Sequence, residues 1–390
     1  MITWRAGVVV SLGARWAGAT ELRVRLEDDD QRPEVRALAY PALVGEPAVG
    51  DRLLLNVSAL ARGLGTGGYA LVVGPAGALP ADPPAGPGHL VKARYTPLQA
   101  LVLGVDEQES EHHERLRDAD DLDGLPVVVA DLHSAVPAIV AGARHAAALA
   151  GRPAPRVAYV MTDGGALPAW FSRTVASLRD AGWIEACVTA GQAFGGDLEA
   201  VTVHTALLAA RLVVGADLVV LAQGPGNLGT GTRWGFSGVA AGEAVNAAGT
   251  LGGRPVASLR VSGADPRPRH LGVSHHSMTA FGRVALVPAD VVVPVFQPGP
   301  TAGVPDEDGR PPLEDGSLTA IGTRVHGQAL ALVTPTGRHR LIEVAAGADL
   351  LAALAASPVR LSTMGRGLAE DPAAFLAAAV AGVHAVDLLA

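Results

Sequence analysis

Lysine and cysteine are nearly absent from this chain of 390 residues. One of its 30 basic residues is a lysine, Lys92, and its single cysteine is Cys187. A Walker phosphate loop needs a Gly-Lys-Ser/Thr sequence, whereas Lys92 follows Leu-Val and precedes Ala, so that nucleotide-binding class is excluded. Cysteine-rich zinc sites, iron–sulfur clusters and intrachain disulfides need at least two thiols and are excluded as well. A Schiff-base enzyme would have to use Lys92 itself.

Long apolar runs and an excess of positive charge are also missing. The net charge is −8 and the isoelectric point is near 5.8, so we expect no nucleic-acid partner. No apolar run approaches the roughly 18–20 residues of a membrane span, and Arg15 and Glu21 interrupt the start too early for a signal peptide. A hydrophobic content of 49% excludes gross disorder, despite 48 glycines and 28 prolines. We therefore expect a cytoplasmic protein with no membrane partner.

Residues 1–74 predict a small β-rich domain that closes as a barrel. Val, Leu and Arg gather in five short strand-like segments separated by turns, among them Asp28–Asp30: 7–12, 21–26, 34–38, 52–57 and 69–73. Residues 75–88 hold five prolines and three glycines, which is typical of a linker. Residues 106–123 hold nine acidic side chains and predict a solvated helix.

A repeating β-loop-α pattern predicts a core domain over residues 89–300. Five buried strand-like runs each lead into a polar or glycine-rich loop: 127–130, 157–161, 186–188, 218–222 and 256–261. Successive loops begin 28 to 39 residues apart, which is long enough for parallel strands joined by helices. The fold class is thus a doubly wound α/β protein with a mostly parallel sheet. Pro168 and Gly182 are expected to bound a helix at 169–181, and Asp197 to cap the helix through Arg211.

Residues 301–390 are expected to pack on this core. They follow a Pro/Gly-rich loop at 297–317 and contain three apolar helical stretches and a short strand that would join the sheet: 318–333, 348–356, 372–386 and 359–362. The expected domain organisation is thus a β-rich domain, a linker, an α/β core domain and a C-terminal segment.

Open α/β sheets bind ligands beyond the carboxyl ends of their strands, so the five loops are the expected site. Asp131 and Asp163 follow different strands and would serve as acid–base groups, with His133 or His275 as a general base near neutral pH. Carboxylate and imidazole also suit a divalent metal, which leaves a second hypothesis open. Its expected ligands are Asp131, His133, His275 and His276.

The loop after the fourth strand predicts an anion site. Its glycines would bring backbone N–H groups close to an anion, its threonines would add donors, and Arg233 would bind the anion with two hydrogen bonds. Two alternatives stay open, a structural turn and a dinucleotide site. The expected substrate-binding residues are Gly224, Gly226, Gly229, Thr230, Gly231, Thr232 and Arg233, with Arg267, Arg269 and Lys92.

Several longer segments are distinctive enough to compare with known families. They are Arg94–Gln99, Glu107–Ser110 with His112–His113, Tyr159–Pro168, Ala193–Val201, Gly229–Thr232 with Gly235–Gly238, Asp265–Arg267 with Ser274–His276, Leu64–Tyr69 and Ser362–Arg366. These segments resemble a bacterial family of uncharacterised proteins, domain of unknown function 3866. The resemblance covers essentially the whole chain and implies a cytoplasmic bacterial protein, without an activity.

Two functions from different classes follow from these observations. The first is a hydrolase or group-transfer enzyme acting on a small anionic, for example phosphorylated, molecule. The alternative is a non-catalytic nucleotide or metabolite sensor that contacts a partner through its β-rich domain. A homo-oligomer is compatible with either function.

Overall fold

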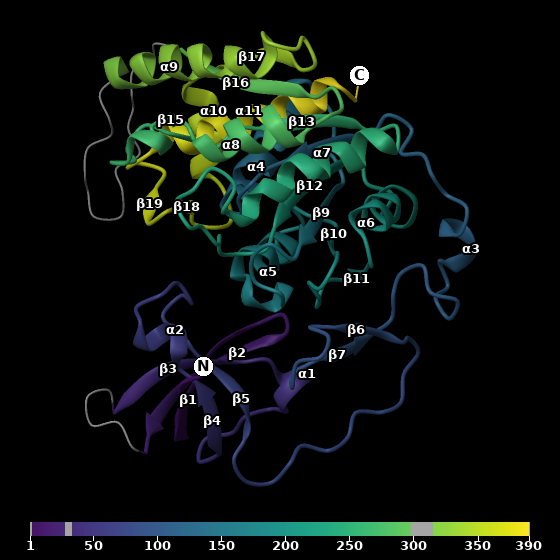
Figure 1. Ribbon diagram of the computed structural model, residues 1–390, viewed down its shortest axis with the longest axis vertical. Helices are drawn as coiled ribbons and strands as arrows, with labels where there is room; N and C mark the ends of the chain where they lie inside the picture. The colour runs from purple at the N-terminus through teal and green to yellow at the C-terminus, as the bar shows by residue number, and fades with distance from the viewer. Residues whose placement is uncertain (1, 28–32, 298–314, 390) are drawn as a thin grey trace. The chain divides into compact units, whose positions relative to one another are not determined.

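The structure is a computed structural model that describes the chain except residues 1, 28–32, 298–314 and 390 (Figure 1). The expected turn at Asp28–Asp30 and most of the expected loop at 297–317 fall outside the described residues. No helix in the described part of the chain is long and apolar enough to cross a membrane.

The chain divides into two compact units. Unit 1 contains Met1–Leu103 and Trp170–Ala176, and unit 2 contains Gly104–Ala169 and Ser177–Ala390. The residues expected to form the β-rich domain and the linker both lie in unit 1, whereas residues 301–390 lie in unit 2.

Unit 1 contains the expected barrel. Its strands close in the order β1-β2-β3-β5-β4, and β3 and β5 run parallel. Alternating small and branched apolar side chains fill the interior, because successive residues of a strand point to opposite faces. Five-stranded Greek-key barrels of this kind include the OB-fold. The strands are β1 (Trp4–Trp16), β2 (Ala19–Leu26), β3 (Glu34–Ala39), β4 (Arg52–Asn56) and β5 (Ala70–Pro75).

The segment Trp170–Ala176 packs on the barrel of unit 1. The indole N–H of Trp16 donates to the carbonyl of Trp170 at 2.6 Å, and Arg173 donates to a carboxylate oxygen of Glu21 at 2.6 Å. Unit 1 also contains the two short helices α1 (Pro41–Val44) and α2 (Ser58–Ala61) and the hairpin of β6 (Leu90–Lys92) and β7 (Ala100–Val102).

Unit 2 is built on an eight-stranded sheet in which every neighbouring pair is parallel. The order is β11-β10-β9-β12-β8-β13-β16-β17. The central strands β8 and β12 are buried along their whole length, as expected for strands covered on both faces. The bounds are β8 (Pro126–Val129), β9 (Val157–Thr162), β10 (Ala186–Thr189), β11 (Leu198–Glu199), β12 (Leu218–Gln223), β13 (Arg254–Ser258), β16 (Asp290–Phe296) and β17 (Arg340–Ala346).

Helices cover both faces of this sheet, so the expected doubly wound α/β fold is confirmed (Figure 1). One face carries α4 (Val136–Leu149), α10 (Ala348–Ala355) and α11 (Pro372–Asp387), which pack together. The other carries α6 (Val203–Ala209), α7 (Ala240–Thr250) and α9 (Asp315–Val333). The remaining helices include α3 (His113–Leu116), α5 (Arg173–Asp180) and α8 (His275–Thr279).

The connections reverse direction between β8 and β13. The chain leaves β8 through α4 toward β9 on one side, and it leaves β13 toward β16 on the other. A crevice opens at such a switch point, beyond the carboxyl ends of the two strands, and there ligands bind in open α/β sheets. The topology therefore predicts a ligand site at the loops that begin at Asp131 and Leu259.

One expected element is present in short form and one is wrong. The acidic segment 106–123 contains the partly exposed helix α3, but this helix has only four residues, because the Glu107 carboxylate and the Ser110 hydroxyl bond to backbone groups of tight turns. The strand expected at 359–362 does not join the sheet. Instead, β18 (Ser362–Thr363) forms a hairpin with β19 (Arg366–Gly367), and the edge position belongs to β17.

The expected helix starts at Pro168 and Asp197 are also wrong. The helix α5 begins at Arg173, after a 3₁₀ turn. Thr202 caps α6 by accepting the N–H of Thr205, whereas Asp197 accepts the N–H of Cys187 at 2.7 Å. The Asp197 carboxylate, preceded by two glycines and followed by β11, thus closes a turn between strands instead of starting a helix.

Candidate functional site

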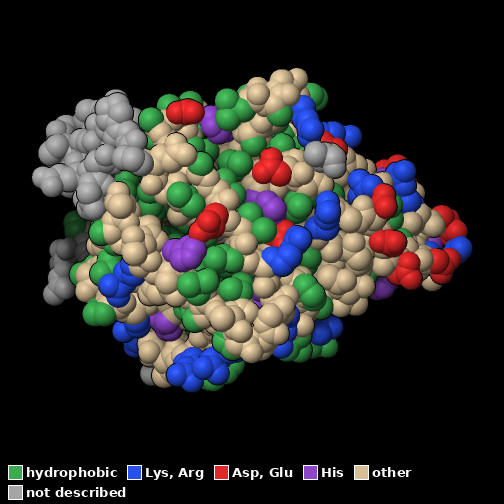
Figure 2. All heavy atoms as spheres, turned by 90° about the horizontal axis from the view of Figure 1, so that it is seen from above, with side chains coloured by type: hydrophobic (Ala, Val, Ile, Leu, Met, Phe, Trp, Pro, Cys, Tyr) green, Lys and Arg blue, Asp and Glu red, His purple; other side chains and the backbone are tan. Residues whose placement is uncertain are grey.

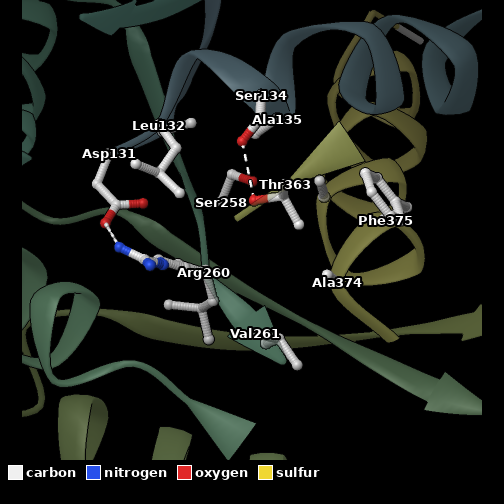
Figure 3. Close-up of a pocket in the computed structure, with 13 residues that line it drawn as sticks. Asp131, Leu132, Ser134, Ala135, Ser258, Arg260, Val261, Thr363, Ala374 and Phe375 are labelled. Carbon is white, nitrogen blue, oxygen red and sulfur yellow. Dashed lines mark hydrogen bonds and ion pairs between the residues drawn. The ribbon is translucent and has the colours of Figure 1, made fainter. Parts of the chain in front are cut away.

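Asp131 and Arg260 face one another across the switch point. Asp131 follows β8, Arg260 follows β13, and the Asp131 Oδ2 atom lies 4.0 Å from Arg260 Nη1 (Figure 3). A cavity of about 30 Å³ lies beside them, with room for about two water molecules. On its far side the hydroxyl of Ser134 bonds to Thr363 of the β18–β19 hairpin at 3.1 Å.

The Asp131 side chain is buried and incompletely partnered. The residue is 3% exposed, and its Oδ2 atom accepts no hydrogen bond from the described part of the chain. Burial raises the pKa of this carboxyl, and the charge of Arg260 opposes that rise only in part. The Gln223 amide bonds to the Asp131 carbonyl at 2.9 Å and leaves its own Oε1 atom without a hydrogen bond. Buried polar atoms without partners are uncommon and mark this place as unusual.

Three histidines gather beside Asp131. Their ring centroids lie 4.4 to 5.1 Å apart. His276 Nδ1 is 3.8 Å from Asp131 Oδ2 and 3.0 Å from Arg260 Nη1, and the His276 ring stacks on Phe236 at 3.9 Å. The histidines of this group, which we term the histidine cluster, are His270, His275 and His276.

A short sequence builds the cluster. Ser274 ends the β14–β15 hairpin of Val261–Ser262 and Gly272–Val273 and caps α8, because its hydroxyl accepts the N–H of His276. The same hydroxyl bonds to His270 Nδ1 at 2.8 Å. One buried serine thus fixes the start of α8 and the orientation of a ring four residues earlier.

The histidine cluster is electrically neutral near pH 7. Burial lowers the pKa of His270 to about 4 and that of His276 to about 3, and the charge of Arg260 adds to both shifts. Burial also lowers the pKa of His275, with a contribution from Arg269. Neutral imidazoles keep a lone pair that can accept a proton or bind a metal.

An arginine-lined cavity of about 660 Å³ adjoins the histidine cluster through His275. Three arginines stand at its walls, and no carboxylate of the described residues pairs with them: Arg233, Arg269 and Arg283. We call this cavity the arginine pocket. Its other lining residues are Gly231, Met278, Thr279, Gly282, Ala331, Leu332 and Pro335.

The glycine-rich loop after β12 folds back on itself. The Thr230 and Thr232 hydroxyls bond to each other at 3.1 Å, and Thr232 also accepts the N–H of Gly235. Gly231 has a φ of +80°, which favours glycine at the turn. The threonine hydroxyls therefore hold the loop, and its contribution to the arginine pocket comes from Gly231 and Arg233.

Three more glycines of the expected anion site have roles in the packing or turns of the loop. A Cβ atom on Gly224 would meet the Ala166 carbonyl at 2.5 Å, so backbone of the β12 loop packs directly on backbone of the β9 loop. Gly226 has a φ of +92°, and Gly229 forms a β-bridge with Phe236. These contacts fit the structural turn that the sequence left open.

The structure places the other expected catalytic residues apart from the histidine cluster. The His133 Nδ1 atom bonds to the Tyr159 hydroxyl of β9 at 2.9 Å, and burial lowers the pKa of His133 to about 4. Asp163 is exposed and accepts the N–H of Gln192 at 2.8 Å. The roles expected for these two residues stay predictions.

Two expected anion-binding residues, Arg267 and Lys92, do not line the arginine pocket. The Arg267 guanidinium makes two hydrogen bonds to the carboxylate of Asp265, at 2.9 and 2.8 Å. Lys92 is 2% exposed and lies in β6 of unit 1. Its expected contact with a ligand stays a prediction.

Sequence reasoning missed His270, Arg260 and Arg283 as site residues. His270 carried a usable signal, because it lies in the same loop as His275 and five residues before it, which is a spacing that one turn and one helix cap can close. Arg260 was hidden inside an expected strand at 256–261, and β13 ends at Ser258. Arg283 follows α8, and the sequence alone does not show that this part of the chain returns to the glycine-rich loop.

The fold and the site define a doubly wound α/β protein with an N-terminal barrel and a histidine–arginine site. A family model described as "protein of unknown function (DUF3866)" matches residues 36–382, so the chain belongs to this family and the sequence resemblance is confirmed. No curated protein matches the chain. No solved structure matches it either.

Proposed function

We propose that this chain is a cytoplasmic enzyme that hydrolyses a small anionic molecule or transfers a group from it. One observation carries the proposal: His275 lines the arginine pocket and also belongs to the histidine cluster. Groups that bind an anion thus lie beside groups that accept protons. This is the arrangement that a reaction on an anionic substrate needs.

The arginine pocket favours a phosphorylated small molecule. Its volume of about 660 Å³ falls within the usual range of ligand pockets, about 300–1,000 Å³. Guanidinium groups bind phosphate or carboxylate oxygens through paired hydrogen bonds. On the face seen in Figure 2, basic side chains of the described residues stand at separate places among acidic ones, which favours a small ligand over a polyanion.

The reaction class follows from the groups beside the pocket. In hydrolysis, the oxygen of water bonds to the electrophilic phosphorus or carbonyl carbon while the bond to the leaving-group oxygen breaks. One proton of the water passes to a basic group of the site, and the leaving oxygen takes up a proton. Burial raises the pKa of Asp131, which is the direction of shift that a carboxyl group needs to act as a proton donor.

The test compares binding and turnover in matched arginine variants. Inorganic phosphate, nucleotides and sugar phosphates are screened for turnover and for binding by calorimetry. We expect Arg233→Ala with Arg269→Ala to weaken binding about 30–1,000-fold, since each of the two lost charged hydrogen bonds costs about 1–2 kcal/mol. Arg152→Ala, an exposed arginine outside the pocket, is the control. Equal binding by the double variant and the control would contradict the proposal.

A second candidate function is the ligand sensor. The observation that favours it is the barrel, which is a compact unit of its own with exposed Trp4, Leu12 and Leu54. A sensor binds the anion in the arginine pocket without consuming it. Binding of an anion with no turnover, across the phosphate-ester screen, would favour the sensor over the enzyme.

A further inference from the structure

The histidine cluster has the dimensions of a metal site. His270, His275 and His276 each offer one ring nitrogen, and the three nitrogens lie within 4.8 Å of one another. A tetrahedral zinc ion with bonds of about 2.0–2.1 Å holds its ligand nitrogens about 3.4 Å apart. Side-chain rotations of the three rings can close this difference without a change in the backbone.

We infer that His270, His275 and His276 bind one divalent transition-metal ion, of which Zn²⁺ fits best. Imidazole ligands suit zinc, copper, iron and nickel, whereas magnesium and calcium prefer oxygen. Three imidazoles leave one position of a tetrahedral ion open for water or substrate, as in catalytic zinc sites. This set differs from the metal ligands expected from the sequence, because His270 takes the place of His133 and Asp131 is not among the ligands.

Unpartnered buried atoms support the site independently of the ring distances. The His275 Nε2 and Asp131 Oδ2 atoms are buried, and neither has a hydrogen-bond partner among the described residues. Asp131 is 3% exposed, and its Oδ2 atom lies 3.8 Å from the His276 ring. A carboxylate that lacks donors at this distance from an imidazole group is suited to offset the charge of a bound cation.

Groups behind the rings already orient them. A histidine that binds a metal through Nε2 donates its Nδ1–H to an outer acceptor, and the Ser274 hydroxyl lies 2.8 Å from His270 Nδ1. The Phe236 ring stacks on His276 with an angle of 1° between the planes. The two most buried rings of the cluster thus each contact a group that favours their present orientation, and only small rotations are needed for all three to bind one ion.

The Arg260 guanidinium lies against the Nδ1 atom of His276, where it would compete with a metal ion bound to that ring. It lies 3.0 Å from His276 Nδ1 and 4.0 Å from Asp131 Oδ2. A metal ion bound at His276 displaces this guanidinium, and the carboxylate of Asp131 is close enough to receive it. Movement of the guanidinium would give Asp131 Oδ2 the hydrogen bond that it lacks among the described residues.

The role of the metal rests on the proposed function, but its binding does not. Because His275 lines the arginine pocket, water on the ion would lie beside a bound anion. Zinc lowers the pKa of such a water to about 7 and supplies a nucleophile near neutral pH. Because the three imidazoles hold the ion, the proton of this water passes to solvent, and the leaving oxygen takes up a proton as in the proposed hydrolysis.

The test measures metal binding without substrate. Full-length protein without a histidine tag is treated with chelator and dialysed against Zn²⁺ or Co²⁺, and bound metal is determined by mass spectrometry. We expect about one ion per chain and, with Co²⁺, a visible absorption band from imidazole coordination. His275→Ala should lower the affinity about 10–100-fold and abolish the band, since it removes one of three ligands.

His133→Ala is the matched control, because His133 also lies in a loop at the carboxyl end of a strand but bonds to Tyr159. It should bind the metal as the unaltered chain does. Circular dichroism checks the fold of each variant, and His275→Gln replaces His275→Ala if the latter unfolds. Equal affinity of the His275 variants and the unaltered chain would overturn the inference, as would loss of metal in His133→Ala. Metal binding without anion binding would leave the site standing and overturn the proposed function.

Discussion

Gly382→Ala should loosen the helix pair that covers one face of the sheet in unit 2. Gly382 lies in the middle of α11, where a Cβ atom would overlap the backbone carbonyl of Ile139 in α4 and lie 2.9 Å from the backbone nitrogen of Ala143. Backbone cannot rotate out of the way as a side chain can. The two helices would have to separate by about 1 Å to restore normal contact.

The cost can be worked out from two opposing effects. Overpacking costs about 1–3 kcal/mol, and contact with rigid backbone favours the upper end of that range. Alanine gains about 1 kcal/mol over glycine in a helix interior. We therefore expect a net loss of about 2 kcal/mol in the free energy of unfolding of unit 2, measured by urea unfolding with far-ultraviolet circular dichroism.

A matched variant separates packing from helix propensity. Gly327 lies in α9, is exposed, and has open space where a Cβ atom would stand. Gly327→Ala should therefore leave unit 2 unchanged or stabilise it by up to about 1 kcal/mol. If Gly382→Ala proves as stable as Gly327→Ala, the close approach of α4 and α11 is refuted.

Two further changes test ion pairs in the two units. Asp265→Asn should destabilise unit 2 by about 2 kcal/mol near pH 7, because the Asp265 carboxylate accepts hydrogen bonds from Arg267 and Arg366. The hydrogen bonds with Arg267 lower the pKa of Asp265. The stabilisation by this carboxylate is therefore present above the ordinary Asp pKa of 3.8 and declines as the pH falls below that value. Unfolding at several pH values should show the stabilities of Asp265→Asn and the unaltered chain converging in acid. Glu21→Gln should destabilise the barrel by about 1–2 kcal/mol, because Glu21 accepts hydrogen bonds from Arg36, Tyr69 and Arg173, and calorimetry measures the shift. An unchanged barrel transition would show that this network contributes little.

The strands of both units could be predicted because their signals are local. Alternation in β1 to β5 and the buried runs of β8, β9, β10 and β12 depend on neighbours a few residues away. The edge of the sheet was harder to predict. β17 has a mixed burial pattern, and its place beside β16 depends on a contact about 50 residues distant in sequence.

The site was predicted only in part for the same reason. Because β8 and β13 are neighbouring parallel strands, the loops that follow them start at the same edge of the sheet. The sequence therefore predicted that Asp131 and the loop of His275 and His276 belong to one site. Which side chain turns toward which neighbour depends on single contacts. His133 turns to Tyr159, and the Ser274 hydroxyl holds His270 instead.

The energetics of Asp131 favour a functional origin for this site. A carboxyl group that is 3% exposed, and whose Oδ2 atom accepts no hydrogen bond from the described residues, destabilises the fold by a few kcal/mol relative to a fully hydrogen-bonded or apolar side chain. Three neutral imidazoles lie beside this carboxyl group, and their burial also costs solvation free energy. The stability of the fold therefore does not explain why these groups lie together. The same groups become favourable when a cation binds, because the carboxylate then offsets its charge and the imidazoles supply lone pairs. The destabilisation caused by these buried groups and the proposed affinity for metal thus have one cause, and a variant that removes the destabilisation should weaken metal binding. Asp131→Leu combined with Arg260→Met, which removes both buried charges, should therefore raise the free energy of unfolding measured in the presence of chelator and lower the affinity for Zn²⁺, and a double variant that loses stability instead would contradict this link.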